Sequence, residues 1–448
     1  MMDHDPQAGA RTAELIRRCR AHSFYTWCAQ DEVDPLPLSG AEGIYLYLPS
    51  GERPIDFNSG SMCVNIGHGD QRVIDAIQRQ VATLPYAPPS TATEIRATLS
   101  ERLVARCPGD INKILYTLGG ADANENAIRM ARLYTGRHKI ICRYRSYHGA
   151  TRLTSALTGD PRRWPNELGS DGIIRTLDPE PYSYSLGDSA QSRGEAALRY
   201  LEELIMYEGP TQIAAVLIET VTGTNGVLVP PPGYLSALRA LLDRHGILLI
   251  CDEVMAGFGR TGAMFAVDHW EVVPDLLTMA KGLTSGYLPL GAVGLRAPIA
   301  EFFRDRYYPG GLTYNAHPSC LAAALANLDV LEGDGLIERA AARGELMSEL
   351  MRVLKEAHPS VRAHRNIGLL GMIDLQRDRE GTPLAPYNGR DPLQSEFIRE
   401  LKARGLYTFM RWGSFMCTPP LCIREDELRG AFEIIDEALT TLERALSL

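Results

Sequence analysis

Between about residues 113 and 295, short apolar runs alternate with helical stretches. The continuous apolar character of these runs is typical of strands that are covered on both faces. Their alternation with helices predicts an α/β fold, in which crossover helices link a mostly parallel central sheet. In such a sheet, ligands bind beyond the carboxyl ends of the strands. The runs lie at residues 113–118, 139–144, 212–220, 246–254, 275–281 and 291–295.

A different pattern precedes this region. Residues 43–60 alternate apolar and polar side chains around the turn Ser50-Gly51, which predicts a β-hairpin. Helices are expected at 72–83 and 92–106, and a Pro-rich loop that contains Tyr86 separates them.

The chain after residue 320 changes pattern again. Two long amphipathic stretches, 320–357 and 424–446, bracket short strand-like pieces. We therefore expect a large domain at 71–325 and a smaller α+β domain that residues 1–70 and 326–448 form together.

Charge and cysteine usage narrow the function. The chain has 448 residues and a formal net charge of −9, which argues against nucleic acid or an anionic membrane surface as a partner. The N-terminal residues mix charges of both signs and lack the apolar stretch of a secretory signal. No stretch approaches the length of about 18 to 20 apolar residues that spans a membrane. The nine cysteines form no C-x-x-C pair, which favours reduced thiols in a cytoplasmic protein over a disulfide framework or a metal site.

A glycine turn follows the first apolar run. Gly119 and Gly120 open a helix in which Ala123, Ala127 and Ala131 repeat at helical spacing. The N–H groups and positive dipole end of such a helix can bind a phosphate. An ordinary strand-to-helix turn is the alternative interpretation.

Tyrosine and acidic side chains follow the next strands. The run at 139–144 leads to Tyr147 and His148, and a ring at a strand end can stack on a flat ligand. Glu219 and Asp252 end two further runs, which places two acids at the ligand edge of the sheet. A core tyrosine and acids that serve as helix caps or ion-pair partners are the alternatives.

Lys281 comes directly out of an apolar run. A lysine there is costly unless it snorkels, pairs or reacts. Partial desolvation would lower the pKa of its amine and leave it able to attack a carbonyl group. The alternative is a solvated strand end.

The segment Gly257-Phe-Gly-Arg-Thr-Gly262 matches the dinucleotide-binding fingerprint. That fingerprint needs a helix that starts at its glycines, and the following residues show no helical period. We interpret these glycines as a tight loop after Asp252, not as a nicotinamide or flavin site.

Taken together, these residues resemble the class III aminotransferases, the group that includes the ω-amino acid:pyruvate, taurine:pyruvate and 4-aminobutyrate enzymes. The resemblance covers nearly the whole chain, and no single block decides it. It implies an aspartate-aminotransferase-like fold, with the mostly parallel sheet in the large, cofactor-binding domain. The matching blocks are residues 66–80, 119–136, 144–151, 214–235, 248–262, 277–293 and 310–320.

By position, the resemblance implies a site for pyridoxal 5′-phosphate. Lys281 would hold the cofactor as a Schiff base, and Asp252 would pair with its ring nitrogen. Val254 would pack on one face of the ring and Tyr147 on the other, while Glu219 and His148 would surround it.

The resemblance also implies a homodimer. Gly120 and Ala121 would donate backbone N–H groups to the phosphate. Thr313 would reach the same phosphate from the partner subunit.

The implied activity moves an amino group from an ω-amino acid or amine to an oxo acid, with pyruvate as the expected acceptor, by a ping-pong mechanism. Asp252 would keep the ring nitrogen protonated, so that the ring accepts the electrons released at the substrate carbon. Lys281 would act as nucleophile and then move a proton. An aminomutase or racemase on the same scaffold is the alternative, since both would use the same two residues and only a transaminase consumes a second oxo acid. A non-catalytic cofactor-binding regulator would need a DNA-reading domain or a lost lysine, and neither is seen.

Several positions depart from the family pattern or bear on the substrate. The family's N-S-G-S-E-A-N block is Leu-Gly-Gly-Ala-Asp-Ala-Asn at 118–124, so its hydroxyls are lost. Thr224 replaces a glutamate that pairs with the active-site arginine in 4-aminobutyrate enzymes, which favours pyruvate over 2-oxoglutarate. Arg411 matches the arginine that binds a carboxylate, and a surface ion pair is its alternative role. Met62 stands where ω-amino acid enzymes often carry Trp, which implies a differently shaped, roomier pocket. Tyr86 is expected to line this pocket too, and packing within its own loop is its alternative role.

Overall fold

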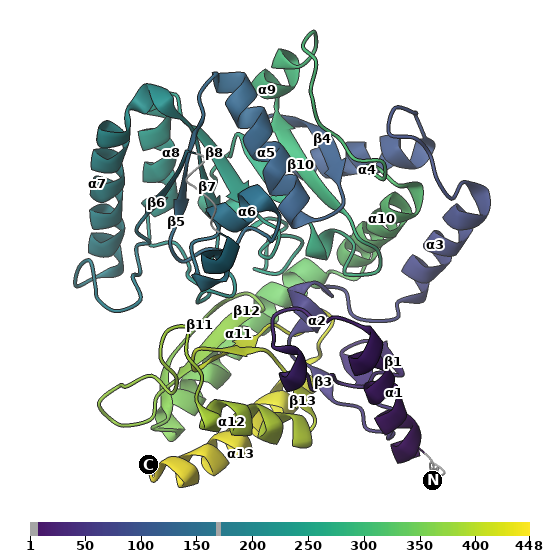
Figure 1. Ribbon diagram of the computed structural model, residues 1–448, viewed down its shortest axis with the longest axis vertical. Coiled ribbons are helices and arrows are strands. Elements are labelled where there is room, and N and C mark those ends of the chain that lie inside the picture. Colours follow the sequence, from purple (N-terminus) through teal and green to yellow (C-terminus); the bar gives the residue numbers. More distant parts are fainter. Residues whose placement is uncertain (1–7, 167–171) are drawn as a thin grey trace.

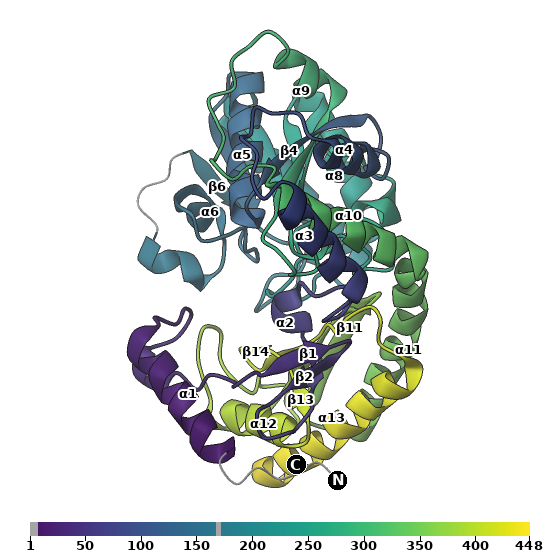
Figure 2. The same cartoon turned by 90° about the vertical axis from the view of Figure 1, so that its right-hand side faces the viewer.

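The computed structural model describes residues 8–166 and 172–448, and these form two bodies that lie one above the other in Figure 1. The upper body contains a seven-stranded sheet between helices, and the lower body contains the two ends of the described chain. Figure 2 shows α10 (Pro318–Gly333) and α11 (Leu336–Ala357) descending from the upper body into the lower one. No helix in the described ranges combines the length and the apolar character that crossing a bilayer requires.

The large sheet confirms the predicted α/β fold. Its strand order is β4-β10-β9-β8-β7-β5-β6; β10 runs antiparallel to both neighbours, and every other neighbouring pair is parallel. All six predicted strands are confirmed, but β6 was not predicted, because its short edge segment is only partly buried and no apolar run marks it. The bounds are β4 Ile111–Thr117, β5 Lys139–Arg143, β6 Ile173–Thr176, β7 Ile213–Glu219, β8 Leu248–Asp252, β9 Leu276–Met279 and β10 Gly291–Arg296.

Successive side chains of a strand point to opposite faces, and this divides the core into two layers. Val216 and Ile218 of β7 join a cluster with Leu238 of α8 (Tyr234–His245). Leu217 between them joins a second cluster with Ala127 of α5 (Gly120–Thr135). Both faces of the sheet are therefore covered, which explains the continuous apolar runs.

The other helices complete the upper body or link it to the lower one. The helices predicted at 72–83 and 92–106 are confirmed within two residues at each end. The bounds are α3 Gln71–Thr83, α4 Glu94–Val104, α6 Arg152–Leu157, α7 Ala190–Glu208 and α9 Ala297–Phe302, with 3₁₀ helices η2 Pro161–Asn166, η3 Pro210–Gln212, η4 Ala266–Trp270 and η5 Lys281–Leu283.

The lower body joins segments from both ends of the chain. Its two four-stranded sheets have the orders β1-β2-β3-β13 and β11-β12-β15-β14. The predicted hairpin is confirmed by the antiparallel pairing of Tyr45 with Ile55. The bounds are β1 Gly40–Glu42, β2 Tyr45–Tyr47, β3 Ile55–Asp56, β11 Val361–Ile367, β12 Leu370–Leu375, β13 Leu406–Tyr407, β14 Met410–Arg411, β15 Ser414–Cys417, α1 Ala8–His22, η1 Gln30–Glu32, α2 Ser59–Met62, α12 Pro392–Ala403 and α13 Glu425–Leu446.

The expectation of amphipathic helices after residue 320 is wrong for α10. Nearly every residue from Pro318 to Leu331 is buried, because α3, α4 and α11 all pack against this helix. The predicted domain boundary at residue 325 falls inside α10. The division into 71–325 against 1–70 and 326–448 stays a prediction, and residues 1–7 lie outside the described ranges.

The glycine-rich loop at 257–262 forms no α-helix, as predicted, and holds the two bodies together. Arg260 is fully buried, and its guanidinium donates to the carbonyl oxygens of Leu369 and Pro419 at 3.2 and 2.5 Å. It also donates to Ser59 Oγ and Asn65 Oδ1 at 3.1 and 3.0 Å. Burial lowers the pKa of this guanidinium to about 10. One side chain thus joins the end of β8 to both halves of the lower body.

Replacing Arg260 with alanine should lower the free energy of unfolding by at least about 3 kcal/mol, because several buried acceptors lose their donor. Urea denaturation followed by circular dichroism measures this change. Arg304→Ala is the control, since its side chain is 74% exposed and pairs only with an exposed glutamate among the described residues. An Arg260→Ala protein as stable as wild type would show that the hydrogen bonds of Arg260 contribute nothing to the free energy of unfolding.

Candidate active site

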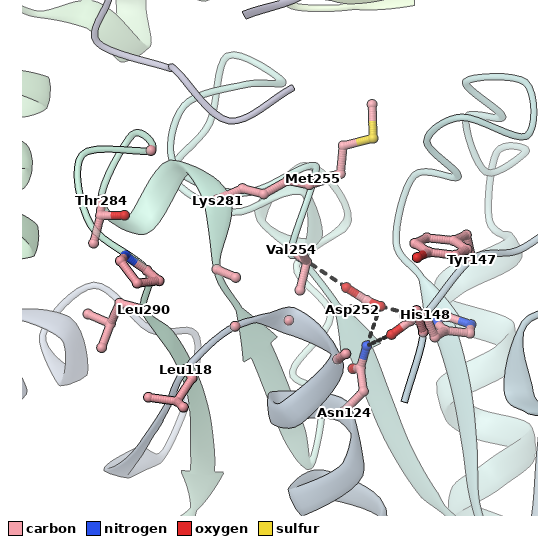
Figure 3. Close-up of a pocket in the computed structure, with 18 of the residues that line it drawn as sticks. Leu118, Asn124, Tyr147, His148, Asp252, Val254, Met255, Lys281, Thr284 and Leu290 are labelled. Atoms are coloured by element: carbon pink, nitrogen blue, oxygen red, sulfur yellow. Dashed lines mark hydrogen bonds and ion pairs between the residues drawn. The ribbon is translucent and has the colours of Figure 1, made fainter. Parts of the chain in front are cut away.

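A cavity of about 570 Å³ lies at the carboxyl ends of the parallel strands, where an α/β sheet is expected to bind its ligand. Figure 3 shows the side chains that converge on it from the ends of β8 and β9, the start of α5 and the loop after β5. Its walls bring together most of the predicted residues: Gly120, Ala121, Tyr147, His148, Glu219, Asp252, Val254 and Lys281.

Lys281 stands two residues after the end of β9 and has a positive φ of 44°, a conformation that L-residues rarely adopt. Asn327 of α10 holds this turn by donating to the carbonyl oxygens of Gly282 and Leu283 at 2.9 and 3.1 Å. In Figure 3 the lysine side chain extends over the cavity towards Met255. The strained turn therefore aims the amine into the cavity.

No hydrogen bond or ion pair from residues 8–166 or 172–448 engages the Lys281 amine. Burial lowers its pKa, and the neighbouring charges of Glu219 and Asp252 only partly oppose that shift. A buried amine with a lowered pKa and no partner is a nucleophile, not a structural charge.

Asp252 is the most constrained acid of the cavity. Its Oδ2 accepts hydrogen bonds from Asn124 Nδ2 and His148 Nδ1, each at 2.8 Å, and its Oδ1 accepts from Val254 N at 3.0 Å. The dashed lines of Figure 3 trace these contacts. An ionised carboxylate has about four acceptor positions, so one is left for a ligand. The residue is buried, which makes that position a strong partner for a cationic N–H.

Sequence reasoning missed Asn124. Its side-chain oxygen accepts from Thr278 Oγ1 at 2.7 Å, and its amide donates both to Asp252 and to the carbonyl oxygen of His148 at 3.0 Å. It lies one helical turn after Gly120 on the face of α5 that packs on the sheet. That helical spacing, together with its match to the last asparagine of the family block at 118–124, is the signal that could have identified it.

Glu219 pairs with Asp252 across neighbouring strands β7 and β8, so two carboxylates lie side by side. Its two oxygens accept from the backbone N–H groups of Tyr147 and Gly223 at 2.9 and 2.8 Å. Burial raises the pKa of Glu219 in spite of these bonds. This residue fixes the backbone on which Tyr147 stands.

The Tyr147 ring lines the cavity, and the side chains of Arg162 and Trp27 also pack against it. The guanidinium of Arg162 lies 3.6 Å from the ring centroid, and Trp27 packs edge-on with its centroid at 5.9 Å. Figure 3 shows the ring on the opposite side of Asp252 from Val254. Val254 and Tyr147 therefore stand as two walls with Asp252 at the base between them.

The start of α5 supplies the backbone donors. Gly120 lies so close to Val254 that an added Cβ would be 2.8 Å from both methyl groups. Gly149, with φ of 136°, is pressed against Ala121 in the same way. The glycines let the helix N-terminus and its N–H groups approach the cavity, which suits a phosphate.

Arg411 does not line this cavity. It lines a neighbouring cavity of about 400 Å³, and Thr224 belongs to the walls of both. Thr224 carries no charge that could pair with the Arg411 guanidinium as the family's glutamate does. Asp160, from a different loop, lies 3.2 Å from its guanidinium.

Met62, Tyr86 and Thr313 also lie outside the lining of the cavity within one chain. Met62 packs at the edge of a small apolar cluster that contains Met255, which does line the cavity. The Tyr86 hydroxyl donates to the carbonyl oxygen of Thr313 at 3.0 Å, at an exposed site. Their predicted roles stay predictions.

The cavity fits pyridoxal phosphate better than a metal ion. An unpaired amine, a carboxylate with one open acceptor position, two ring-sized walls and a helix N-terminus match an aldehyde, a pyridine nitrogen, a flat ring and a phosphate. No cluster of His, Cys, Asp and Glu in the described residues is arranged to hold a metal ion.

Comparisons with known proteins agree with this geometry. Residues 28–439 match the family described as aminotransferase class-III. The omega-aminotransferase of Caulobacter vibrioides is 33% identical over 92% of this chain and 93% of its own length. The beta-alanine–pyruvate aminotransferase of Pseudomonas aeruginosa is 32% identical over 91% and 92%.

A solved structure, the taurine:2-oxoglutarate aminotransferase of Bifidobacterium kashiwanohense in complex with pyridoxal phosphate and glutamate, is 36% identical and superposes with a TM-score of 0.93. The match covers 97% of this chain and 99% of that one. Fold, cavity and sequence thus agree: this chain belongs to the class III aminotransferases, enzymes that depend on pyridoxal phosphate.

Proposed function

We propose that this enzyme moves an amino group from an ω-amino acid or amine to an oxo acid, with pyruvate as the acceptor, and that Lys281 and Asp252 are its catalytic residues. The observation that carries this proposal is the unpaired Lys281 amine, which shares one buried cavity with a fully oriented Asp252. No other lysine lines that cavity.

When bound, pyridoxal phosphate supplies an aldehyde that captures amines and a ring that accepts electrons. Gly120 and Ala121 would hold its phosphate through backbone N–H groups, and Val254 and Tyr147 would contact opposite faces of its ring. Glu219 would act indirectly, since it holds the Tyr147 backbone.

Lys281 has two tasks in this proposal. Its Nζ would be the group that holds the aldehyde of the cofactor, and the lowered pKa suits this role because only the uncharged amine is nucleophilic. When it does not hold the cofactor, the same Nζ would carry a proton between the substrate carbon and the cofactor.

Asp252 would hold a proton on the ring nitrogen through its open acceptor position. Asn124, His148 and Val254 N fix the carboxylate, so it need not reorient when the ring becomes more basic. With the carboxylate ionised, His148 must donate from Nδ1.

The substrates are proposed from charge and from the relatives. Arg162 donates to Thr224, which lines both cavities, and Arg411 lines the second cavity. A guanidinium suits carboxylate or sulfonate recognition. Two of the relatives named above are a beta-alanine–pyruvate aminotransferase and a taurine:2-oxoglutarate aminotransferase. The absence of the family's glutamate at Thr224 supports pyruvate. No observation favours an aminomutase or racemase.

A homodimer, with Thr313 reaching the phosphate of the partner subunit, belongs to the same proposal. It is supported by the exposure of Thr313 and of the adjacent Tyr314, which is 57% exposed. A cytoplasmic location is supported by nine cysteines that form no disulfide.

Lys281→Ala should abolish transamination and the visible absorbance of bound cofactor. In the wild type that absorbance should disappear when β-alanine is added and return with pyruvate, one oxo acid being consumed per amine. Stopped-flow absorbance and product analysis measure both. Lys281→Arg is the matched control, because it keeps a positive charge but no primary amine, and it should also be inactive. An active Lys281→Ala enzyme would remove the basis of the proposal.

Asp252→Asn should retain cofactor while kcat falls about 100-fold or more, the effect of removing a preorganised electrostatic group. An amide does not hold the ring nitrogen protonated as a carboxylate does. Cofactor content by absorbance after denaturation, together with steady-state rates, separates binding from catalysis. Asp243→Asn, at a side chain that is 62% exposed, is the control. Full activity in Asp252→Asn would refute its catalytic role.

Gly120→Ala should weaken cofactor binding about tenfold, because the new methyl group would force Val254 or the start of α5 to shift. Adding Val254→Ala should restore part of the affinity by making room. Fluorescence titration of the apoenzymes with pyridoxal phosphate measures both dissociation constants. Equal affinities for wild type, single and double variants would show that this contact does not shape the site.

A further inference from the structure

Asp160 stands immediately before η2, and its carboxylate is buried between two arginines. Arg162 donates to it from Nε at 3.0 and 3.1 Å and from Nη2 at 2.5 Å. Arg411 Nη1 lies at 3.2 Å and the Asn225 side-chain amide at 3.0 Å. One acid therefore serves two guanidiniums from different parts of the chain.

The backbone holds this acid in one place. Gly159 leaves no room for a side chain, since an added Cβ would be 2.2 Å from the carbonyl oxygens of Arg143 and Tyr144. The Arg162 backbone N–H donates to Asp160 Oδ1 at 2.9 Å. Burial would raise the pKa of Asp160, but Arg162 and Arg411 hold it below its usual value.

Both arginines reach the substrate side of the site. Arg162 stacks on Tyr147 and donates to Thr224 Oγ1 at 3.1 Å. Arg411 stacks on Trp412, with its guanidinium carbon 3.9 Å from the ring centroid, and lines the second cavity. Thr224 lines both cavities, so Arg162 contacts a residue of their common wall while Arg411 lines the second cavity.

The net charge of Asp160, Arg162 and Arg411 suggests what kind of ligand this cluster can bind. Two guanidiniums and one carboxylate carry a net charge of +1, which one singly charged anion would neutralise. Without such an anion, Arg411 keeps Asp160 as its partner. No guanidinium is then buried without a counter-charge, a state that would cost free energy. Among the described residues, the other titratable groups near this cluster include Arg145, Arg163, the amine of Lys281 and the phenols of Tyr147 and Tyr387. Arg145 and Arg163 donate to backbone carbonyl oxygens.

We propose that Asp160 is a specificity-determining residue: it neutralises one of the two guanidiniums, so that the site accepts substrates with one distal carboxylate or sulfonate and also tolerates uncharged amines. This proposal rests on the proposed transaminase function. In this chain Asp160 takes the part that a glutamate at position 224 would otherwise play. Specificity then comes from a charge balance and not from one arginine.

The test compares charge classes of ligand in Asp160→Asn holoenzyme. The variant lacks one negative charge, so it should bind the unreactive dianion glutarate more tightly relative to the monoanion propionate. The ratio of the Ki for glutarate to the Ki for propionate should fall about tenfold. The kcat/KM for benzylamine should fall about tenfold, because its binding now leaves a guanidinium unpaired. Asp160→Glu should restore both values towards wild type. A role in holding the loop alone would change all ligands by one common factor, and that result would overturn the proposal.

Two further variants guard against misfolding. Asp275→Asn is the matched control, because Asp275 is also a buried acid between two arginines, Arg239 and Arg296, but stands at the opposite end of β9. It should leave the ratio between ligand classes unchanged. If Asp160→Asn does not fold, Arg411→Gln carries the test: it should weaken propionate binding about tenfold and spare benzylamine, and equal losses would overturn the proposal. Absence of transamination in wild type would instead refute the proposed function.

Discussion

The site depends on one electrostatic constraint, which is that charged groups at the ends of buried strands need partners. Strands β7 and β8 are apolar up to their last residues, Glu219 and Asp252, and Lys281 stands two residues after the end of β9. Both acids are satisfied by hydrogen bonds from the chain itself. The Lys281 amine has no such hydrogen bond from the described residues. The fold therefore leaves one reactive amine beside side chains whose positions hydrogen bonds fix.

The parallel register makes this arrangement compact. Glu219 and Asp252 are direct neighbours across two strands, and Asp252 is paired with Thr278 on the third, three residues before Lys281. Asn124 links the layers, since it holds Asp252, Thr278 and the backbone of His148 at once. The base of the cavity is thus a single hydrogen-bonded unit in which one helix and two strands take part.

The lower body adds charge instead of catalytic groups. It contributes Arg411, which meets Asp160 of the upper body beside Thr224. Arg260 stands in the loop that follows Asp252, and its hydrogen bonds hold the two bodies together. The base of the cavity therefore belongs to the upper body, whereas the charge balance beside Thr224 depends on how the two bodies meet.

The pattern of apolar runs determined the six strands and the order of chemistry along the chain, because continuous burial leaves a direct record in the sequence. Strand ends in a parallel sheet meet at one edge, so Lys281, Asp252, Glu219 and Tyr147 could be placed together without coordinates. The edge strand β6 and the buried helix α10 were not read correctly, since their environment comes from neighbours distant in sequence. The roles of Asn124, Asp160 and Arg162 were not predicted for the same reason. Their importance lies in pairings that cross from one element to another, and only the tertiary structure decides which charge faces which.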